Sequence, residues 1–247
     1  MRKLDVHAHC GPWNTIPIAK WDEHALIARY RPLEIERGIV SSVEALLADL
    51  VSGNQETQRV VEVCDALYGY IYLDPHRLDD SRAQVEVLSQ HPKFVGVKSR
   101  DDYHGLAYNS PAYRRVFASM AEYRLPALLH VFSVRSMQSA MEVAADYTAP
   151  MILTHFGGFE WRQCEHLRGS DIPDNVYLDP VSSASAPGKY ELALSLVGED
   201  RLVFGTDATL FHPALAVGAI ESSDLSEAVK RKLYWGNAER VFFPGSR

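Results

Sequence analysis

Eight short apolar runs rich in β-branched residues recur along the 247-residue chain and limit its fold more than any other feature. They occupy residues 3–6, 38–40, 70–73, 94–97, 127–129, 151–153, 175–178 and 201–204. Their starts are roughly 24 to 35 residues apart, close to the length of one βαβ unit of about 30 residues. Continuous apolar runs are typical of parallel strands buried on both faces. The sequence therefore predicts a parallel α/β sheet.

The segments between the runs carry the apolar periodicity and the capping residues of helices. Ser110, with a proline after it, and Ser133 are each expected to cap a helix, and Asn54 can cap a third. A late helix is outlined from Ser223 and is expected to stop near Gly236. Eight strands alternating with helices predict a single (β/α)8 TIM barrel over residues 1–247, with no additional domain.

A doubly wound open sheet is the competing fold, and the turn after the first run counts against it. That fold usually carries a glycine-rich turn at this point. Here the turn reads His-Ala-His-Cys-Gly-Pro over residues 7–12. Residues 157 and 158, a Gly-Gly pair after the run at 151–153, are too short a glycine stretch for a phosphate loop.

The composition excludes several classes of protein. Lysine and arginine number 25 against 32 acids, a net charge of −7, which argues against nucleic acid as a partner. Cys10, Cys64 and Cys164 stand far apart, as expected in a reducing compartment. No apolar run reaches the roughly 18 residues of a membrane span, and the charged start does not resemble a signal peptide. We therefore expect a cytoplasmic protein with no membrane contact.

Polar residues follow the apolar runs at the places where barrel enzymes build their sites. His7 and His9 follow the first run, and His130, His155 and Asp207 follow the runs at 127–129, 151–153 and 201–204. Because strand side chains alternate with period two, His7 and His9 should both point into the barrel mouth. Each residue alone has an ordinary structural explanation, a core histidine or a turn cap. Together they favour a divalent metal site, and two imidazoles suit zinc.

These residues lie in stretches that resemble a known family. The stretches are residues 4–9, 94–98, 128–130, 152–158, 202–207 and 235–242, and they occur in the family's order over nearly the whole chain. They resemble the amidohydrolase superfamily, and specifically its amidohydrolase-related (amidohydrolase 2) branch of metal-dependent TIM-barrel hydrolases and decarboxylases. The resemblance is specific for the superfamily but not for a substrate.

The resemblance implies a role for each of the five residues. His7, His9, His130 and Asp207 would be metal ligands, and Asp207 would also take the proton from an attacking water. His155 would either bind a second metal or polarise the substrate carbonyl. A catalytic metal leaves one position for water and lowers the pKa of that water to about 7.

Lys98 decides the number of metal ions under this resemblance, because some relatives carry a carboxylated lysine at its position and others a glutamate. A carboxylated Lys98 would be a ligand bridging two ions. An unmodified Lys98 would pair with a substrate carboxylate or with Asp5, and one zinc ion would follow, which we favour. Asp5 is expected to share the inward face of His7, one layer deeper.

A few residues are expected to contact substrate or to enclose it. Arg100 follows the run at 94–97, and its guanidinium suits a substrate carboxylate, although rim arginines are often only solvated. Residues 11–21 and 100–109 are the longest loops at this end and would form the walls. Trp13 and Trp21 would line the pocket or merely cover the barrel, and Cys10 is expected to pack rather than react.

The leading hypothesis for function is a hydrolase in which metal-bound hydroxide attacks an ester, lactone or amide carbonyl of a small molecule. The alternative is a metal-dependent, non-oxidative decarboxylase of an aromatic or unsaturated acid. We rank it lower because several such relatives replace the first histidine of the His-x-His pair, which His7 keeps. A TatD-like phosphodiesterase is less favoured, since its Gly-Glu-x-Gly strand has no equivalent here. The fourth hypothesis is a binding protein without activity. Formation of a homo-oligomer stays an open alternative.

Overall fold

Seven parallel strands form one curled sheet over the residues that the computed structural model describes, 1–14, 16–18, 20–184 and 186–245. The strands pair in sequence order, each with the next along the chain. Their bounds are β1 Lys3–Cys10, β2 Ile35–Ser42, β3 Leu67–Tyr72, β4 Phe94–Arg100, β5 Ala127–His130, β6 Met151–Thr154 and β7 Val176–Asp179. Seven of the predicted runs thus lie in strands, and all the pairings are parallel as expected.

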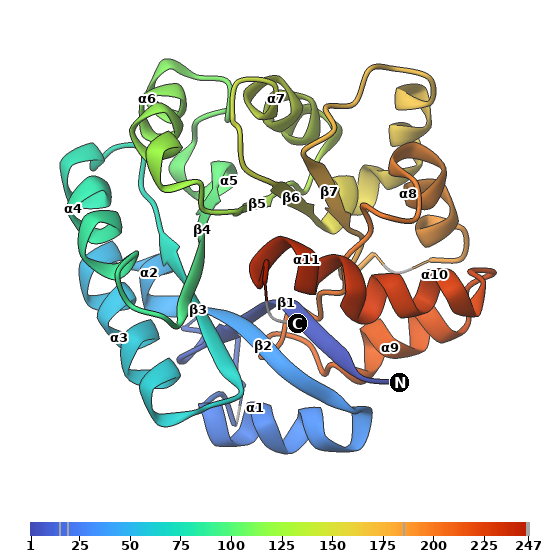
Figure 1. Ribbon diagram of the computed structural model, residues 1–247, viewed down its shortest axis with the longest axis horizontal. Helices are drawn as coiled ribbons and strands as arrows, with labels where there is room; N and C mark the ends of the chain where they lie inside the picture. Colours follow the sequence, from blue (N-terminus) through green and yellow to red (C-terminus); the bar gives the residue numbers. More distant parts are fainter. Residues whose placement is uncertain (15, 19, 185, 246–247) are drawn as a thin grey trace.

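Most helices surround the outer side of this sheet, whereas the last helix, α11, lies across its interior (Figure 1). The α-helices are α1 Glu23–Tyr30, α2 Val43–Leu47, α3 Leu50–Val63, α4 Leu78–Leu88, α5 Asp101–His104, α6 Pro111–Met120, α7 Val134–Ala144, α8 Lys189–Val197, α9 Ala214–Glu221, α10 Glu227–Arg231 and α11 Asn237–Phe242. Short 3-10 helices span Arg31–Leu33 and Ala121–Tyr123, kinked 3-10 turns follow β6 over His155–Leu167, and a π-helix spans Lys232–Gly236. Apolar side chains of the strands pack beneath these helices in one large core.

The eighth run is not a regular strand, so the complete eight-stranded barrel is only partly realised. Its residues still bridge the two edges of the sheet through backbone hydrogen bonds. The Val203 amide donates to the Leu178 carbonyl of β7 at 3.0 Å, and the Val6 amide of β1 donates to the Phe204 carbonyl at 2.9 Å. Single bridges also join Leu178 with Leu202 and Ala8 with Ala208. The run forms too few bonds on each side for a ladder.

A second apolar cluster fills the interior of the sheet. It joins residues from strands on opposite sides, including Leu4 and Val6 of β1 with Leu128 of β5. Trp235, Phe242 and their neighbours before and within α11 pack against it at the end where the strands begin. Side chains at the opposite end of the strands therefore have a floor of apolar residues beneath them.

Strand β1 does not alternate regularly, which corrects the expected position of Asp5. Leu4 and Val6 face the interior cluster, whereas Ala8 and Cys10 pack in the outer core. The strand register is irregular between Asp5 and Ala8, so the alternation of faces breaks there. Asp5 consequently does not share the face of His7: its carboxylate accepts hydrogen bonds from Tyr30 of the outer helix α1 and from Thr206.

The helix caps are partly as expected. Ser110 and Ser133 cap α6 and α7, confirming both predictions. Asp49 rather than Asn54 caps α3. The late helix outlined from Ser223 begins at Glu227 as α10, with Ser226 as its cap. Helical structure also continues past Gly236 into α11 instead of stopping there.

Asn54 has a different task, because its buried amide pairs with the backbone of Tyr72 in β3. The Tyr72 amide donates to Asn54 Oδ1 at 2.8 Å, and Asn54 Nδ2 donates to the Tyr72 carbonyl at 3.2 Å. The side chain thereby joins α3 to the end of β3.

All three cysteines are free. Across the described residues we find no helix with the length and apolar character that crossing a membrane requires.

We predict that Asp49→Ala and Asn54→Ala destabilise the protein by different amounts. Loss of the Asp49 cap should cost about 1 kcal/mol. Loss of Asn54 leaves two buried backbone groups of Tyr72 without their partner, and each such group costs about 1–3 kcal/mol. Urea unfolding of the two variants measures the difference. An Asn54→Ala variant less destabilised than Asp49→Ala would contradict this reading of the two side chains.

Candidate active site

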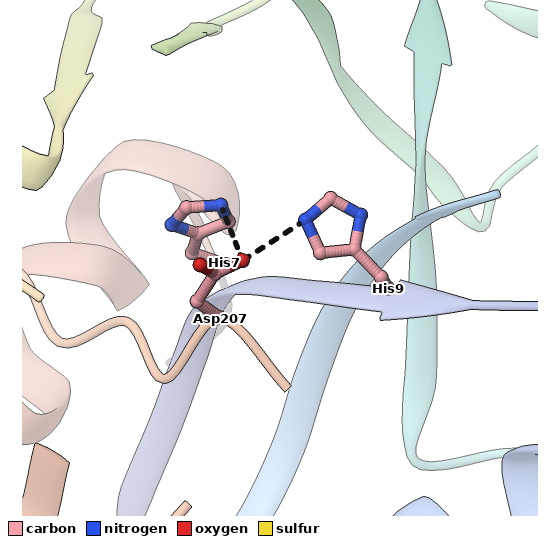
Figure 2. Close-up of side chains that lie close together, drawn as sticks. All are labelled: His7, His9 and Asp207. Carbon is pink, nitrogen blue, oxygen red and sulfur yellow. Dashed lines mark ion pairs between the residues drawn. The ribbon is translucent and has the colours of Figure 1, made fainter. Parts of the chain in front are cut away.

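His7, His9 and Asp207 come together where β1 meets the end of the eighth run (Figure 2). Each offers one ligand atom, and these atoms lie within 4.8 Å of one another. Asp207 Oδ1 is 3.2 Å from His9 Nε2 and 3.5 Å from His7 Nε2. All three side chains are buried. The expectation that His7 and His9 point the same way is therefore met.

Backbone bonds and Asp5 hold Asp207 in this position. The amides of Thr206 and Asp207 both donate to the His7 carbonyl, at 3.3 and 2.7 Å. Asp5 Oδ1 accepts from the amides of His7 and Thr206, each at 3.0 Å. Burial raises the pKa of Asp5 to about 7, while its hydrogen bonds act in the opposite direction. Asp207 itself has a positive φ of 53°, a conformation that is costly unless such contacts enforce it.

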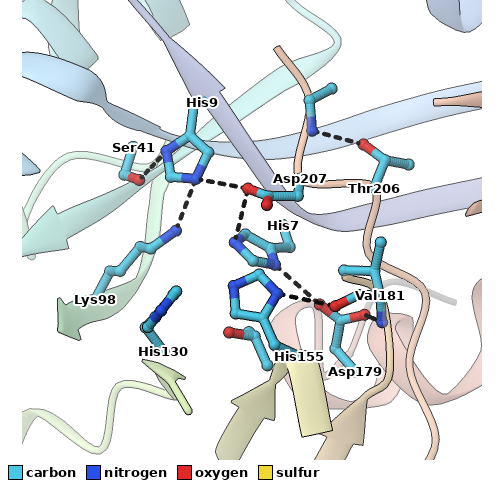
Figure 3. A network of polar contacts seen from close by, with 12 residues as sticks. His7, His9, Ser41, Lys98, His130, His155, Asp179, Val181, Thr206 and Asp207 are labelled. Atoms are coloured by element: carbon cyan, nitrogen blue, oxygen red, sulfur yellow. Dashed lines mark hydrogen bonds and ion pairs between the residues drawn. The ribbon is translucent and has the colours of Figure 1, made fainter. Parts of the chain in front are cut away.

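Asp179 belongs to the site but is missing from the sequence prediction. Asp179 lies at the end of β7, and its Oδ2 is 3.0 Å from Nδ1 of His7 (Figure 3). A histidine that binds a metal through one nitrogen characteristically donates from the other to a carboxylate. The place of Asp179 in the sequence could have identified it as a site residue, because it directly follows the run at 175–178 just as His130 follows the run at 127–129.

The protonation of these groups suits a metal ion. Burial lowers the pKa of His7 and of His9 well below its usual value, so both imidazoles are neutral at pH 7. Nearby Lys98 contributes in the same direction. Neutral imidazole nitrogens and a carboxylate oxygen are zinc ligands. Burial raises the pKa of Asp207, a cost that a cation beside it would offset. The donor set therefore fits a divalent cation.

His155 lies directly after β6, with its ring between those of His7 and His130. The ring centroids are 4.9 Å from His7 and 4.4 Å from His130. Its Nδ1 is 2.8 Å from the carbonyl of Val181. Since a carbonyl only accepts, Nδ1 carries the proton and the neutral ring keeps a lone pair on Nε2. Burial lowers the pKa of His155 well below its usual value.

Lys189 fixes the backbone at His155 and is another residue that sequence reasoning missed. His155 has a positive φ of 66°, and the three residues after it also have positive φ. The buried ammonium of Lys189 donates to the His155 carbonyl at 2.9 Å and to Ser182 Oγ at 2.6 Å. It thus joins the turn after β6 to the loop after β7 that supplies Val181. Burial lowers the pKa of Lys189 to about 7.

His130 is buried at the end of β5, but its Nε2 is engaged by Arg100 rather than by the three-residue cluster. Arg100 Nη2 donates to His130 Nε2 at 3.2 Å, and Asp102 Oδ2 lies 3.4 Å from the same nitrogen. A metal ligand at His130 would require Nε2 to leave Arg100. Its role as a ligand stays a prediction.

Lys98 of β4 reaches the centre of the site. Its Nζ donates to His9 Nε2 at 3.2 Å (Figure 3). Burial lowers the pKa of Lys98 to about 7, although the charge of Asp207 opposes the shift. Asp5 is bound instead to Tyr30, Thr206 and the His7 amide. Among the described residues no hydrogen bond joins Lys98 to Asp5.

A cavity of about 290 Å³ opens in front of these groups. Its lining includes His9, His130, His155 and Asp207, together with Trp13, Ile16, Arg100, Asp102, Tyr103, Phe132, Ser183, Leu210 and Phe211. Both loops expected to form walls contribute, although residues 15 and 19 of the first lie outside the described residues. Trp13 packs edge-on against the His9 ring, whereas Trp21 is partly exposed. The cavity is the size of a small-molecule site.

We predict that Asp179→Asn weakens divalent metal binding without preventing folding. The amide keeps the shape of the carboxylate but cannot supply its charge to His7 Nδ1, and such partners typically contribute 10- to 100-fold in affinity, about 1–3 kcal/mol. Competition with a chromogenic chelator measures the metal affinity. Ser41→Ala, which alters the weaker 3.3 Å contact to His9, is the matched control and should change it less. Unchanged affinity in Asp179→Asn would remove Asp179 from the site.

Solved structures with similar folds cover almost the whole chain. A 5-carboxyvanillate decarboxylase from Sphingomonas paucimobilis has a TM-score of 0.77 at 13% identity, covering 98% of each chain. A dihydroxybenzoic acid decarboxylase from Polaromonas sp. JS666, with bound manganese and 2-nitroresorcinol, has 0.76 at 17%, covering 98% of this chain and 96% of the other. A probable 2-pyrone-4,6-dicarboxylic acid hydrolase from Acinetobacter baumannii, with citric acid bound, has 0.69 at 15%, covering 98% and 99%.

Sequence comparison agrees with this fold. No curated protein matches the chain significantly. The family model described as amidohydrolase, of the amidohydrolase 2 branch, matches residues 5–243. The match spans β1 to the end of α11 and includes every residue of the His7, His9 and Asp207 cluster. The chain therefore belongs to the amidohydrolase family, as its motifs predicted.

Proposed function

We propose that this protein is a metal-dependent hydrolase that cleaves an ester, lactone or amide bond of a small, carboxylate-bearing molecule. One observation carries the proposal: two neutral imidazoles and one carboxylate converge within 4.8 Å, and His9 and Asp207 of this cluster line a small cavity. The first position of the His-x-His pair is still a histidine, His7, whereas several decarboxylase relatives replace it. This difference favours hydrolysis over decarboxylation.

His7, His9 and Asp207 would hold one divalent ion, most simply zinc, with His130 as a fourth ligand once its Nε2 leaves Arg100. When bound, such an ion lowers the pKa of a coordinated water and stabilises negative charge on a carbonyl oxygen. Asp179 orients His7 through Nδ1, and Ser41 lies beside Nδ1 of His9.

Asp207 would act as the proton acceptor in this reaction. Its Oδ1 lies 3.2 Å from His9 Nε2 and 3.5 Å from His7 Nε2, and therefore close to any water that the proposed ion would hold. His155 also lines the cavity and would assist. Because its Nδ1 proton is committed to Val181, Nε2 first accepts a proton and only then can donate a hydrogen bond to a substrate carbonyl. Burial and the neighbouring His130 lower the pKa of His155 and disfavour that protonated form, whereas the negative charge of Asp207 favours it.

Arg100 and Lys98 supply positive charge for a substrate carboxylate. Both are buried, and Arg100 lines the cavity. A net charge of −7 gives the whole molecule no attraction for anions, so these two groups and the metal must provide it locally. The cavity volume of about 290 Å³ limits the substrate to a small molecule.

A decarboxylase of a small aromatic acid is the second candidate. Two of the three similar structures described above are decarboxylases of aromatic acids, and Phe132 and Tyr103 line the cavity of this chain. The same cluster would then hold substrate oxygens, and a protein acid would protonate the ring carbon.

A product assay on the metal-reconstituted protein separates the two candidates. We expect lactones and esters of small dicarboxylic acids to release acid, measured by titration at constant pH. Hydroxybenzoates should release no carbon dioxide above background. Carbon dioxide release with no hydrolysis of any lactone, ester or amide would replace the first proposal with the second.

The His130→Ala variant tests the fourth ligand. We expect it to lose both bound metal, measured by elemental analysis after dialysis, and turnover by at least about 100-fold, because three protein ligands would remain where four are proposed. His166→Ala, which changes an exposed histidine on the turns after β6, is the control. A fully active, metal-replete His130→Ala variant would remove His130 from the ligand set.

Lys98→Met tests the number of ions. With a single ion held by His7, His9 and Asp207, the variant should still bind about one metal per chain. Its affinity for carboxylates should fall, because it has lost a buried cation. If the wild type binds two ions and the variant none, Lys98 is a carboxylated bridging ligand.

A further inference from the structure

Arg100, the proposed contact for a substrate carboxylate, already binds a carboxylate of the protein itself. Asp102 Oδ1 accepts from Arg100 Nε at 3.1 Å, and Asp102 Oδ2 accepts from Arg100 Nη2 at 2.7 Å. This two-point contact is the geometry with which an arginine binds a carboxylate ligand. Asp102 therefore occupies the position that a substrate carboxylate would take.

The two partners differ in how firmly they are held. The Arg100 side chain is only 10% exposed, and its guanidinium carbon lies 3.6 Å from the centre of the Tyr103 ring. The Asp102 side chain is 41% exposed and lies on α5, a helix of four residues. Arg100 is thus a fixed receptor, whereas Asp102 is the partner that can move.

Space beside Asp102 allows this movement. Asp102 and Phe132 border both the active-site cavity and a second cavity of about 480 Å³. The second cavity is also lined by Arg135, an exposed cation at the start of α7. An Asp102 carboxylate that leaves Arg100 can therefore turn toward another positive charge without entering an apolar environment.

We propose that Asp102 is a specificity-determining residue that competes with substrate carboxylates for Arg100. This inference rests on the proposed function only in assuming that the substrate carries a carboxylate. A ligand must displace Asp102 before it can bind Arg100, so its apparent affinity falls by the fraction of molecules in which Arg100 is free. The penalty is the same for every carboxylate that binds Arg100, so a monocarboxylate without other contacts falls below useful affinity, whereas a substrate with additional contacts to the site still binds.

Benzoate binding to the metal-reconstituted protein, measured by calorimetry at pH 8, tests the proposal. Asp102→Asn should bind benzoate about tenfold more tightly than the wild type, because an amide does not compete as an anion. Asp102→Ala should also bind benzoate more tightly than the wild type. This second variant keeps the test valid if one of the two fails to fold. Adding Arg100→Gln to Asp102→Asn should abolish the gain. Thermal unfolding of each variant checks that it is folded.

Asp101→Asn is the matched control, since it removes the same charge one position away. Asp101 lines the second cavity but does not line the active-site cavity. Burial raises the pKa of Asp101 to about 6, so it is ionised at pH 8 and the charge change is real. Its benzoate affinity should stay at the wild-type value.

Three results would overturn the proposal: unchanged or weaker benzoate binding in Asp102→Asn, an equal gain in Asp101→Asn, or no measurable binding by any variant. Weaker binding would mean that Asp102 merely orients Arg100. The assay needs no turnover, so failure of the proposed hydrolase reaction is recorded separately. Tighter binding in Asp102→Asn without hydrolysis of any substrate would retain the competition and reject the function.

Discussion

The site depends on the hydrogen bonds that the Asp5 carboxylate accepts, because these bonds join β1 to the irregular eighth run. It accepts from the amides of His7 and Thr206 and from the Thr206 hydroxyl. These bonds fix the residue before Asp207 against the strand that carries His7 and His9. Without a regular ladder on the eighth run, side-chain bonds supply the registration that backbone pairing provides elsewhere in the sheet. Together with the backbone bonds from Thr206 and Asp207 to the His7 carbonyl, this connection brings the three candidate ligands together.

Burial then determines the chemistry of the groups so assembled. Lowered pKa values leave His7, His9 and His155 neutral, and raised pKa values make Asp179 and Asp207 stronger bases. Each buried group is compensated by a specific partner: Asp179 by His7, His155 by Val181, and Arg100 by Asp102. Anion binding at Arg100 would therefore require exchange of a partner that the protein already provides.

Sequence reasoning succeeded where local periodicity carries the information and failed where a distant contact does. The caps Ser110 and Ser133 were predicted correctly because each acts on an amide three residues away. Asn54 was misread as a cap because its true partner is the backbone of Tyr72 in the next strand. Asp5 was placed on the wrong face because strict alternation was assumed through an irregular part of β1.

The sequence by itself determined the parallel α/β arrangement, the family, and the set of histidines and aspartate at the strand ends, since each follows from short-range patterns. Only the tertiary structure decided that Asp179 orients His7, that Lys189 holds the turn at His155, and that Asp102 occupies Arg100. The contact of His7 with Asp179 joins residues 172 positions apart, and that of Asp5 with Thr206 joins residues 201 apart. No periodicity of 2 or 3.6 residues encodes such pairs, because they exist only once the sheet has curled and brought its first and last segments together.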